Sequence, residues 1–361
     1  MARIVTVYTT WRRPFVPTDM AYIRWLKISE ALARLGHQVD MATNERRLFG
    51  RRRVVPLGNN LRRVPVSWVR WAEYDVVKTL FHEGFETLER YGGAGHPFII
   101  SKLGSVVGPV DRPNVYFFGE QRARLFTTQE RVARTSRYVT LLTRESEALW
   151  RSCFPAAPTT LLVPGAVDAE IPLPHHDPYP ARYPRRCLFA GNFYGERYQP
   201  ESHRVLVGKL NLLGKLLGGR GIRLFVVGPG DAGALDRKHV TAVGPVPYAA
   251  SWDYLFFAGV GIVLAFGVHQ NDNESTKIYH YLRAGLPAVC ESGFPNESLL
   301  VEAGLGYVAA NGDLEGMAAL IARAMDQNWE RASAVRYVLE RHTWDRRAAV
   351  YHALFKSLSL P

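Results

Sequence analysis

Apolar residues recur along this chain with two periodicities. One is typical of strands and the other of helices, and the two follow each other in turn. A short apolar run at residues 3–10 predicts a strand, and a loop with two prolines separates it from a helix. Five apolar residues of this helix are spaced 4, 3, 4 and 3 apart and so share one face: Ala21, Trp25, Ile28, Leu32 and Leu35. Gly36 ends the helix before a strand at residues 37–42, which completes a β-α-β unit.

The alternation continues through the first half of the chain. Further strands are expected at residues 74–79, 97–101, 115–118, 138–142 and 159–163, with helices between several of them. This order is typical of a parallel sheet covered by helices on both faces.

A proline-rich segment interrupts the alternation near the middle of the chain. Residues 167–187 contain five prolines and have no apolar periodicity, which indicates a linker between domains. We expect a first domain at residues 1–170, a linker at 171–187 and a second domain at 188–344. A C-terminal helix at residues 345–361 is expected to pack back on the first domain.

The alternation restarts after this segment. Strands are expected at residues 187–190, 222–227, 239–243 and 261–264, and helices at residues 201–217, 248–257, 314–325, 329–341 and 344–358. The chain therefore predicts an α/β fold of two Rossmann-like, doubly wound domains that face each other across a cleft.

Residues 272–291, DNESTKIYHYLRAGLPAVCE, carry the strongest local pattern in the chain. A polar loop with candidate helix caps comes first: Asp272, Asn273, Glu274, Ser275 and Thr276. Lys277 adds a cation where the backbone N–H groups of a helix start already favour an anion. Gly285 and Pro287 end the helix before a buried strand. The segment predicts a phosphate site; the alternative is a loop and helix with a solvated lysine.

Glycines follow three other strands of the second domain: Gly191-Asn192-Phe193, Gly228-Pro229-Gly230 and Gly244-Pro245-Val246. Ligands of open α/β sheets collect at the carboxyl ends of the strands, and glycine lets a backbone approach a ligand closely. The alternative is that these glycines only form turns.

Composition narrows the class of protein. A chain of 361 residues with 47% hydrophobic residues is long enough for two domains. Three widely spaced cysteines argue against a disulfide framework or a zinc cluster and for a cytosolic protein. The N-terminal apolar run is interpreted as a strand and not a signal peptide, and the longest uncharged run, residues 254–268, is too short to span a membrane.

Positive charge is concentrated in the first half of the chain. Residues 1–170 carry 25 Lys and Arg against 16 Asp and Glu, or +9, and the rest of the chain carries +3. Seven arginines form a cluster expected at the surface: Arg46, Arg47, Arg51, Arg52, Arg53, Arg62 and Arg63. Such a cluster suits anionic lipid headgroups or an acidic substrate, or is a solvated loop. No nucleic-acid-binding module accompanies it, so nucleic acid is not expected as a partner.

The second half resembles the nucleotide-binding domain of GT-B glycosyltransferases, the class that contains the family 4 enzymes (glycosyl transferases group 1). The motifs that carry the likeness are VPGAVDAEIP, FAGNF, LFVVGPGD, VTAVGPV, KIYHYLRAGLPAV and the closing HTWDRRAAVYHAL. Such enzymes bind a nucleotide sugar between two Rossmann-like domains and pass the sugar to an acceptor held mainly by the first.

The resemblance implies roles for individual residues. The loops at Gly191 and Asn192, at Gly228 and at Gly244, Pro245 and Val246 would lie by the nucleotide, together with Asn273, Ser275 and Thr276. Asp272 and His280 occupy the two positions of the Glu-x7-Glu pattern, for the donor sugar and the ribose respectively. Lys277 would neutralise the diphosphate, with Arg197 as a second cation. His280 departs from the pattern, and a packed or solvated histidine is the alternative for it.

The first domain matches the class less closely. Trp11-Arg12-Arg13-Pro14 replaces the usual glycine-rich loop, whereas Tyr116 to Glu120 resembles a segment of the glucuronosyltransferase-like inverting branch. Glu120 is therefore the first candidate for the base that deprotonates the acceptor, and His82-Glu83 the second.

The sequence predicts a metal-independent glycosyltransferase that needs no cofactor, because the nucleotide-diphosphate sugar is a co-substrate. The expected acceptor is a glycan or a lipid-linked acceptor, and the expected location is the cytoplasm, at the inner face of the plasma membrane. Two alternatives stay open: a catalytically degenerate GT-B scaffold and a sugar-nucleotide epimerase. The donor base and sugar, the acceptor and the stereochemistry are left open.

Overall fold

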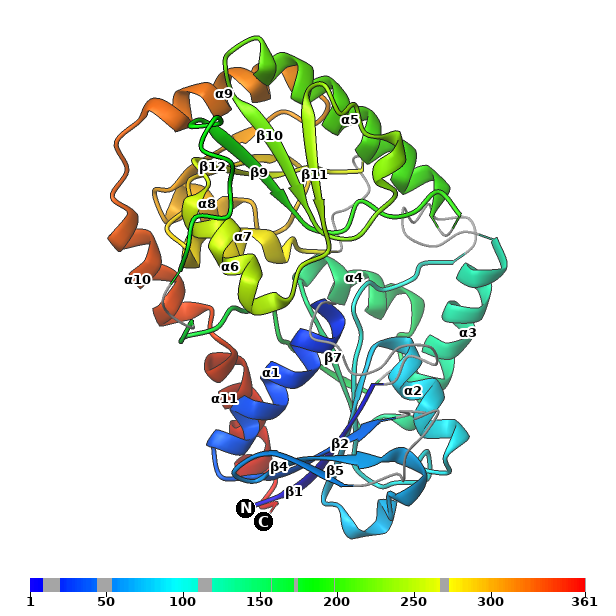
Figure 1. The fold of residues 1–361 in the computed structure, drawn as a ribbon. Helices are drawn as coiled ribbons and strands as arrows, with labels where there is room; N and C mark the ends of the chain where they lie inside the picture. The colour runs from blue at the N-terminus through cyan, green and yellow to red at the C-terminus, as the bar shows by residue number, and fades with distance from the viewer. Residues whose placement is uncertain are drawn as a thin grey trace, which may run out of the picture. The chain divides into compact units, whose positions relative to one another are not determined.

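Two parallel sheets, each covered by helices, organise the computed structural model of this chain (Figure 1). It describes residues 1–8, 20–43, 54–109, 119–156, 158–171, 175–197, 199–266 and 273–360. The contacts divide the chain into unit 1, Met1–Pro113, Phe117–Pro164 and Trp344–Pro361, and unit 2, Asn114–Tyr116 and Gly165–Thr343. The last helix therefore belongs to the first unit.

Unit 1 is built on a sheet of order β3-β4-β2-β1-β5-β6-β7-β8, in which only the β3–β4 pair is antiparallel. Its strands are β1 (Arg3–Val7), β2 (Gln38–Thr43), β3 (Val55–Gly58), β4 (Leu61–Pro65), β5 (Val76–Leu80), β6 (Ile99–Lys102), β7 (Tyr138–Leu141) and β8 (Thr159–Leu162). Its helices are α1 (Met20–Arg34), η1 (Val66–Trp68), η2 (Trp71–Glu73), α2 (Phe81–Arg90), α3 (Gly119–Thr135), α4 (Arg144–Cys153) and α11 (Trp344–Ser357).

The apolar spacing of α1 produces the face that the sequence predicted. Trp25, Ile28 and Leu32 are buried, whereas Leu35 is 36% exposed because the helix ends at Arg34. The C-terminal helix α11 packs on α1. Both nitrogens of the Arg34 guanidinium that face α11 donate to Asp345, at 2.9 and 2.7 Å.

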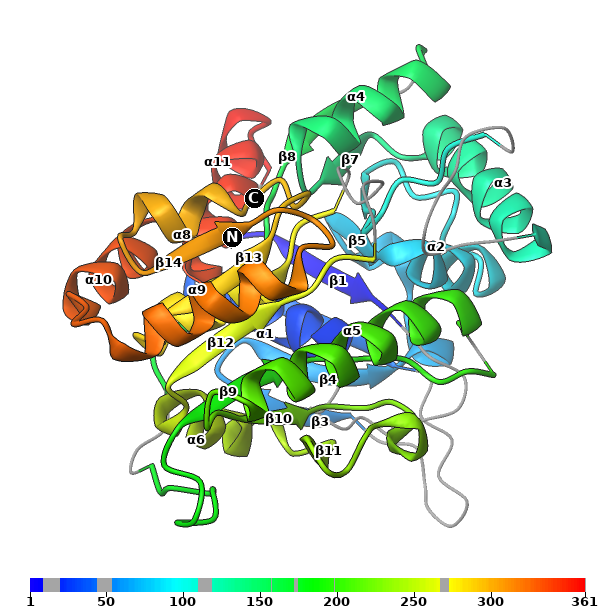
Figure 2. The ribbon, with the colours of Figure 1, turned by 90° about the horizontal axis from the view of Figure 1, so that it is seen from above.

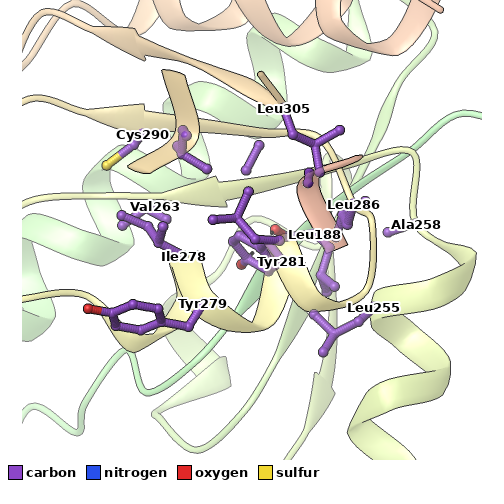
Figure 3. Packing of buried hydrophobic residues seen from close by; sticks show 14 of the residues in the cluster. Leu188, Leu255, Ala258, Val263, Ile278, Tyr279, Tyr281, Leu286, Cys290 and Leu305 are labelled. Carbon is purple, nitrogen blue, oxygen red and sulfur yellow. Dashed lines mark hydrogen bonds between the residues drawn. The ribbon is translucent and has the colours of Figure 1, made fainter. Parts of the chain in front are cut away.

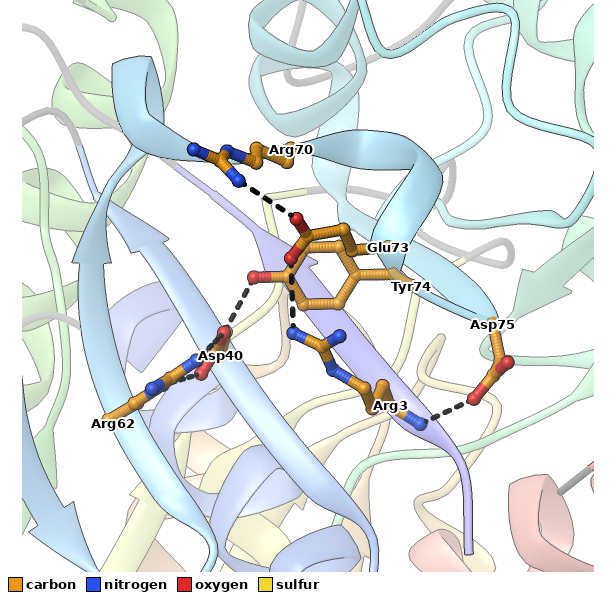
Figure 4. Close-up of polar contacts among 7 residues, drawn as sticks. All are labelled: Arg3, Asp40, Arg62, Arg70, Glu73, Tyr74 and Asp75. Atoms are coloured by element: carbon orange, nitrogen blue, oxygen red, sulfur yellow. Dashed lines mark hydrogen bonds and ion pairs between the residues drawn. The ribbon is translucent and has the colours of Figure 1, made fainter.

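One arginine of the predicted cluster, Arg62 in β4, has a specific partner. It is exposed, as expected, and its guanidinium donates to both oxygens of the buried Asp40, at 2.5 and 2.9 Å. Tyr74 also donates to Asp40, at 2.6 Å, and Figure 4 shows these three side chains converging. Arg46, Arg47, Arg51, Arg52 and Arg53 lie outside the described residues, as does the strand expected at residues 115–118.

Unit 2 contains a fully parallel sheet of order β11-β10-β9-β12-β13-β14. Its strands are β9 (Arg186–Ala190), β10 (Arg223–Val227), β11 (Val240–Gly244), β12 (Val260–Val263), β13 (Ala288–Glu291) and β14 (Gly306–Ala309). Its helices are α5 (Pro200–Gly218), η3 (Ala232–Ala234), α6 (Tyr248–Phe257), α7 (Thr276–Arg283), α8 (Ser298–Glu302), α9 (Leu314–Asp326) and α10 (Arg331–Arg341).

Helices cover both faces of this second sheet. The helices α5 and α9 pack side by side on one face, as Figure 2 shows, and α6, α7 and α8 contact the other. Part of the expected linker packs here too, since the hydroxyl of the buried Tyr179 donates to Tyr254 O at 2.8 Å. Among the helices of the described residues, none is long and apolar enough to cross a membrane.

Candidate functional site

The glycine loops predicted in the second half lie next to one another at the carboxyl ends of β9, β10 and β11. Gly191 N donates to Val227 O at 2.8 Å, and Gly228 N donates to Gly244 O at 2.9 Å. The parallel ladder thus continues beyond the strands, and three loops from distant parts of the sequence form one edge.

Each glycine in this edge has a steric or conformational reason. Gly228 has φ +143°, and a side chain there would overlap the carbonyl of Gly191. Gly244 has φ +87°, a left-handed conformation that other residues adopt only at a cost. Gly228 therefore allows two loops to approach each other closely, and Gly244 allows the backbone turn at the end of β11.

Tyr281 of α7 fills the topological switch point of this sheet, between β9 and β12. The strands pair only through Val260 and Gly261 before they diverge. The Tyr281 hydroxyl lies in the gap, where it donates to Ile262 O at 3.1 Å and accepts from Ala190 N at 3.1 Å. Figure 3 shows its ring among the buried apolar side chains. The buried tyrosine therefore holds α7 against the ends of two strands.

Two further contacts fix the start of α7. The buried carboxylate of Glu274 accepts from Gly165 N and, at 2.8 Å, from the Tyr279 hydroxyl. Asn296 bonds both backbone groups of Ser275, at 2.9 Å each. The sequence predicted a capping hydroxyl here, but the side chain of Ser275, at the N-cap position, makes no capping bond. The helix start is held by more distant side chains instead.

Lys277 is the cation that this scaffold positions. Its side chain passes over Gly191, and its ammonium lies 5.0 Å from the centroid of the Phe189 ring. Burial lowers the pKa of Lys277 to about 8. No carboxylate of the described residues lies within ion-pairing distance of Lys277. Among the described residues, therefore, no carboxylate competes with an anionic ligand for this ammonium.

His280 lies one turn further along α7 and is buried. Its Nδ1 bonds Thr276 O at 2.9 Å, so Nδ1 carries the proton, and Nε2 bonds the Tyr248 hydroxyl at 3.1 Å. Its ring lies 5.4 Å from that of Trp252. Both nitrogens are engaged by the protein, so a ribose hydroxyl would have to replace Tyr248 to reach Nε2.

The remaining predicted residues of this edge are more accessible. Asn192 is exposed, and its Oδ1 accepts from Tyr194 N at 2.7 Å. Arg197 and Pro245 are exposed, whereas Val246, Asn273 and Thr276 are partly buried. Asp272, the predicted partner of the donor sugar, lies outside the described residues.

The two candidate bases of unit 1 differ in their surroundings. Glu120 is exposed in the first turn of α3. His82 is buried and bonds Gln129 Oε1 at 3.2 Å, and burial lowers its pKa to about 4. Gln129 in turn bonds both backbone groups of Val107. His82 is thus part of the packing of α2 on α3, and of the His82-Glu83 pair only Glu83 is exposed.

A buried ion pair near the same sheet edge was missed by the sequence analysis. Glu291 ends β13 and is fully buried; Lys209 of α5 bonds both its oxygens, at 2.7 and 2.8 Å. The Glu291 carboxylate also accepts hydrogen bonds from Ala265 N and Gly312 N. The pair fixes the loop after β12. The one feature of the sequence that could have indicated this ion pair is a carboxylate at the end of a buried strand. No group of three or more His, Cys, Asp or Glu side chains in the described ranges is arranged to hold a metal ion.

No family model matches the sequence, and no curated protein matches it either. Solved structures match nearly its whole length. Sucrose-phosphate synthase of Thermosynechococcus elongatus aligns with a TM-score of 0.70 at 16% identity over 99% of both chains. HepE of Anabaena, solved with UDP and glucose, aligns with a TM-score of 0.66 at 11% identity over 99% of this chain and 100% of its own.

A third match is the E. coli protein described as trehalose-6-phosphate bound with UDP-2-fluoro glucose. Its TM-score is 0.66 at 10% identity, over 98% of this chain and 99% of its own. At such identities the likeness concerns the fold. The chain thus has the α/β fold of GT-B glycosyltransferases, with two parallel-sheet domains, as the sequence predicted.

Proposed function

We propose that this protein is a glycosyltransferase that moves a sugar from a nucleotide-diphosphate sugar to an acceptor hydroxyl. The observation that carries the proposal is Lys277, an ammonium without a carboxylate partner in the described chain, held over Gly191 beside the switch point of a parallel sheet. Ligands of such sheets bind at that point. Structures with the same fold include HepE solved with UDP and glucose, which supports a nucleotide-sugar donor.

The diphosphate is the part of the donor that Lys277 would recognise. Negative charge grows on the leaving diphosphate during transfer, and a fixed cation stabilises that charge. The N-terminus of α7 adds backbone N–H groups that favour an anion, and Arg197 is a further candidate. The reaction is proposed to need neither metal nor cofactor. Equal turnover with EDTA and with Mg²⁺ is the expected result.

The motifs of the second half favour the family 4 enzymes within this fold. In that reading the loops at Gly191, Gly228 and Gly244 face the nucleotide and Asp272 binds the donor sugar. Retention would use the leaving phosphate as the base, and inversion would use Glu120. The anomeric configuration of the product, read by NMR, distinguishes the two.

The acceptor is proposed to be a glycan or a lipid-linked acceptor at the cytoplasmic face of a membrane. The +9 charge of residues 1–170 supports an attraction to anionic lipid. Sedimentation with anionic and neutral vesicles tests this attraction. Binding to anionic vesicles that falls with added salt is expected, and equal sedimentation with both kinds would contradict it.

The donor site is tested by thermal shift with uridine, guanosine, adenosine and thymidine diphosphates. One of them should raise Tm, since a ligand that binds only the folded state stabilises it by mass action. Lys277→Ala should abolish the shift, whereas Lys215→Ala, at an exposed position of α5, should retain it. A shift that survives Lys277→Ala would refute the phosphate role.

A second candidate is a GT-B protein that binds a nucleotide sugar without transferring it. The state of His280 favours this candidate, because the residue stands at the expected ribose position with both ring nitrogens engaged by the protein. Nucleotide binding without release of nucleotide from any donor, in the presence of a panel of acceptors, would support it over transfer.

A further inference from the structure

Unit 1 has its own topological switch point, between β1 and β5. From β1 the sheet extends through β2, β4 and β3 on one side, and from β5 through β6, β7 and β8 on the other. The two strands are parallel and in register from Ile4 and Val76 to Val7 and Thr79. The carboxyl ends of β1 and β5 therefore flank the place where an open α/β sheet binds a ligand.

An aromatic residue in a strained backbone conformation lies at this point. Phe81 follows β5 directly and has φ +57°, the left-handed region that bulky side chains rarely adopt. A non-glycine residue is strained in this conformation, and asparagine tolerates it better than other residues with a side chain. Strain of this kind collects at functional sites, where the surrounding structure holds it in place.

The neighbours of Phe81 hold its ring in one orientation. Tyr8, directly after β1, packs against the ring in a T-shaped arrangement with centroids 5.6 Å apart. Gly104, after β6, leaves room for the ring, because a side-chain carbon there would lie 2.9 Å from Phe81 Cε1. Phe81 nevertheless stays partly exposed, while Tyr8 and Leu80 beside it are buried. The strained turn thus leaves an aromatic residue partly exposed at the switch point.

We propose that the Phe81 ring is a platform on which a neutral pyranose ring of the acceptor stacks. The C–H face of a pyranose is apolar and weakly positive, so it packs on the electron-rich face of an aromatic ring. The exposed carboxylate of Glu83, in the same first turn of α2, can accept hydrogen bonds from the hydroxyls of a neutral sugar. The inference rests on the proposed function, because it names the acceptor that the transferase would use and makes Phe81 a specificity-determining residue.

The test measures binding of methyl glucoside, methyl galactoside and methyl mannoside by saturation-transfer NMR at millimolar concentration. At least one should bind the wild-type protein. Phe81→Asn, which suits the left-handed backbone but lacks the ring, should lose the signal, and Phe81→Tyr should keep it. Phe126→Leu, which removes a ring from the pair with Phe154 in the same unit, is the control and should bind normally.

Stability separates this role from a packing role. Phe81→Asn should keep the Tm of the wild type, because relief of strain offsets the lost contacts with Tyr8 and Gly104. A lower Tm with unchanged pyranoside binding would overturn the proposal, as would the absence of binding to the wild type. Nucleotide diphosphate shifts, measured on the same samples, report the proposed function separately. A nucleotide shift without pyranoside binding refutes only the platform, and the reverse result refutes only the donor site.

Discussion

The side chain of Lys277 lies across Gly191, so that a side-chain carbon at residue 191 would come within 2.9 Å of Lys277 Nζ and would overlap its stem. The two residues belong to different elements, the start of α7 and the end of β9. The relationship gives Gly191 a specific purpose, which is to leave the space that the ammonium occupies. It also provides a way to move the ammonium without deleting it.

Gly191→Ala should therefore weaken nucleotide diphosphate binding while leaving the fold intact. The added methyl group displaces only the far end of a flexible side chain, so the cost to stability is small. We expect an affinity loss of about tenfold, or ~1.4 kcal/mol, by titration calorimetry. Gly208→Ala, in α5 with open space around the new methyl group, is the control and should bind as the wild type does. Equal affinity in both variants would contradict the placement of the ligand beside Lys277.

Nucleotide binding should depend on pH through Lys277. Its pKa is lowered to about 8 by burial, so the ammonium loses its proton as the pH rises above 8, and a diphosphate then has to bind with uptake of a proton. The affinity should level off toward pH 7, and it should fall by about tenfold per pH unit well above pH 8. Lys277→Arg, whose charge persists across this range, should remove the dependence. The check is calorimetry between pH 7 and 10 in buffers of different ionisation enthalpy, which counts the protons taken up.

Lys78→Met should stabilise the protein near neutral pH. Lys78 is buried in β5, and its ammonium lies 5.0 Å from the centroid of the Tyr351 ring. Burial lowers its pKa to about 7, below the value of an unfolded chain, so the unfolded state binds more protons between about pH 7 and 10. Stability of the wild type should rise with pH over that window. We expect a gain of roughly 2 kcal/mol for Lys78→Met at pH 7, shrinking toward pH 10. Urea denaturation at several pH values measures it, and a destabilised variant at pH 7 would contradict the account.

Glu274→Ala should destabilise unit 2 more than Tyr279→Phe does. Removal of the carboxylate leaves two buried donors, Gly165 N and the Tyr279 hydroxyl, without their acceptor, which costs roughly 1–3 kcal/mol. Tyr279→Phe removes one donor with its bond and should cost about 1 kcal/mol. Thermal unfolding of the full chain compares the two. Equal Tm values for Glu274→Ala and the wild type would show that the carboxylate does not hold the start of α7.

The sequence predicted α7 and its surroundings well because the signals there are local. Gly285 and Pro287 end the helix where expected, and Ala288 begins the buried strand. The register of apolar residues likewise placed α5 and α6, with bounds that differ by a residue or less from the prediction. The spacing of apolar residues, together with the glycines and prolines that end helices, is enough to predict such elements.

Contacts between distant residues could not be predicted in this way. Glu274 was interpreted as a loop former, but its partner Gly165 is 109 positions away, and Lys209 is 82 positions from Glu291. The β3–β4 hairpin was missed because Pro56 and Gly58 are unfavourable in strands. The bond from Arg62 to Asp40 depends instead on the parallel pairing of β4 with β2, which places the two residues opposite each other. The hydrogen bonds of His280 depend on Tyr248, from another helix.

The central claim is transfer of a sugar from a nucleotide sugar bound at Lys277. The most direct measurement is release of nucleotide diphosphate from a panel of nucleotide sugars, with and without a mixture of glycan and lipid-linked acceptors. We predict release from one donor class that increases with acceptor, yields a glycosylated product and falls by at least about a hundredfold in Lys277→Ala, or ~3 kcal/mol of transition-state stabilisation. Nucleotide binding with no release from any donor, or release that Lys277→Ala leaves unchanged, would contradict the account.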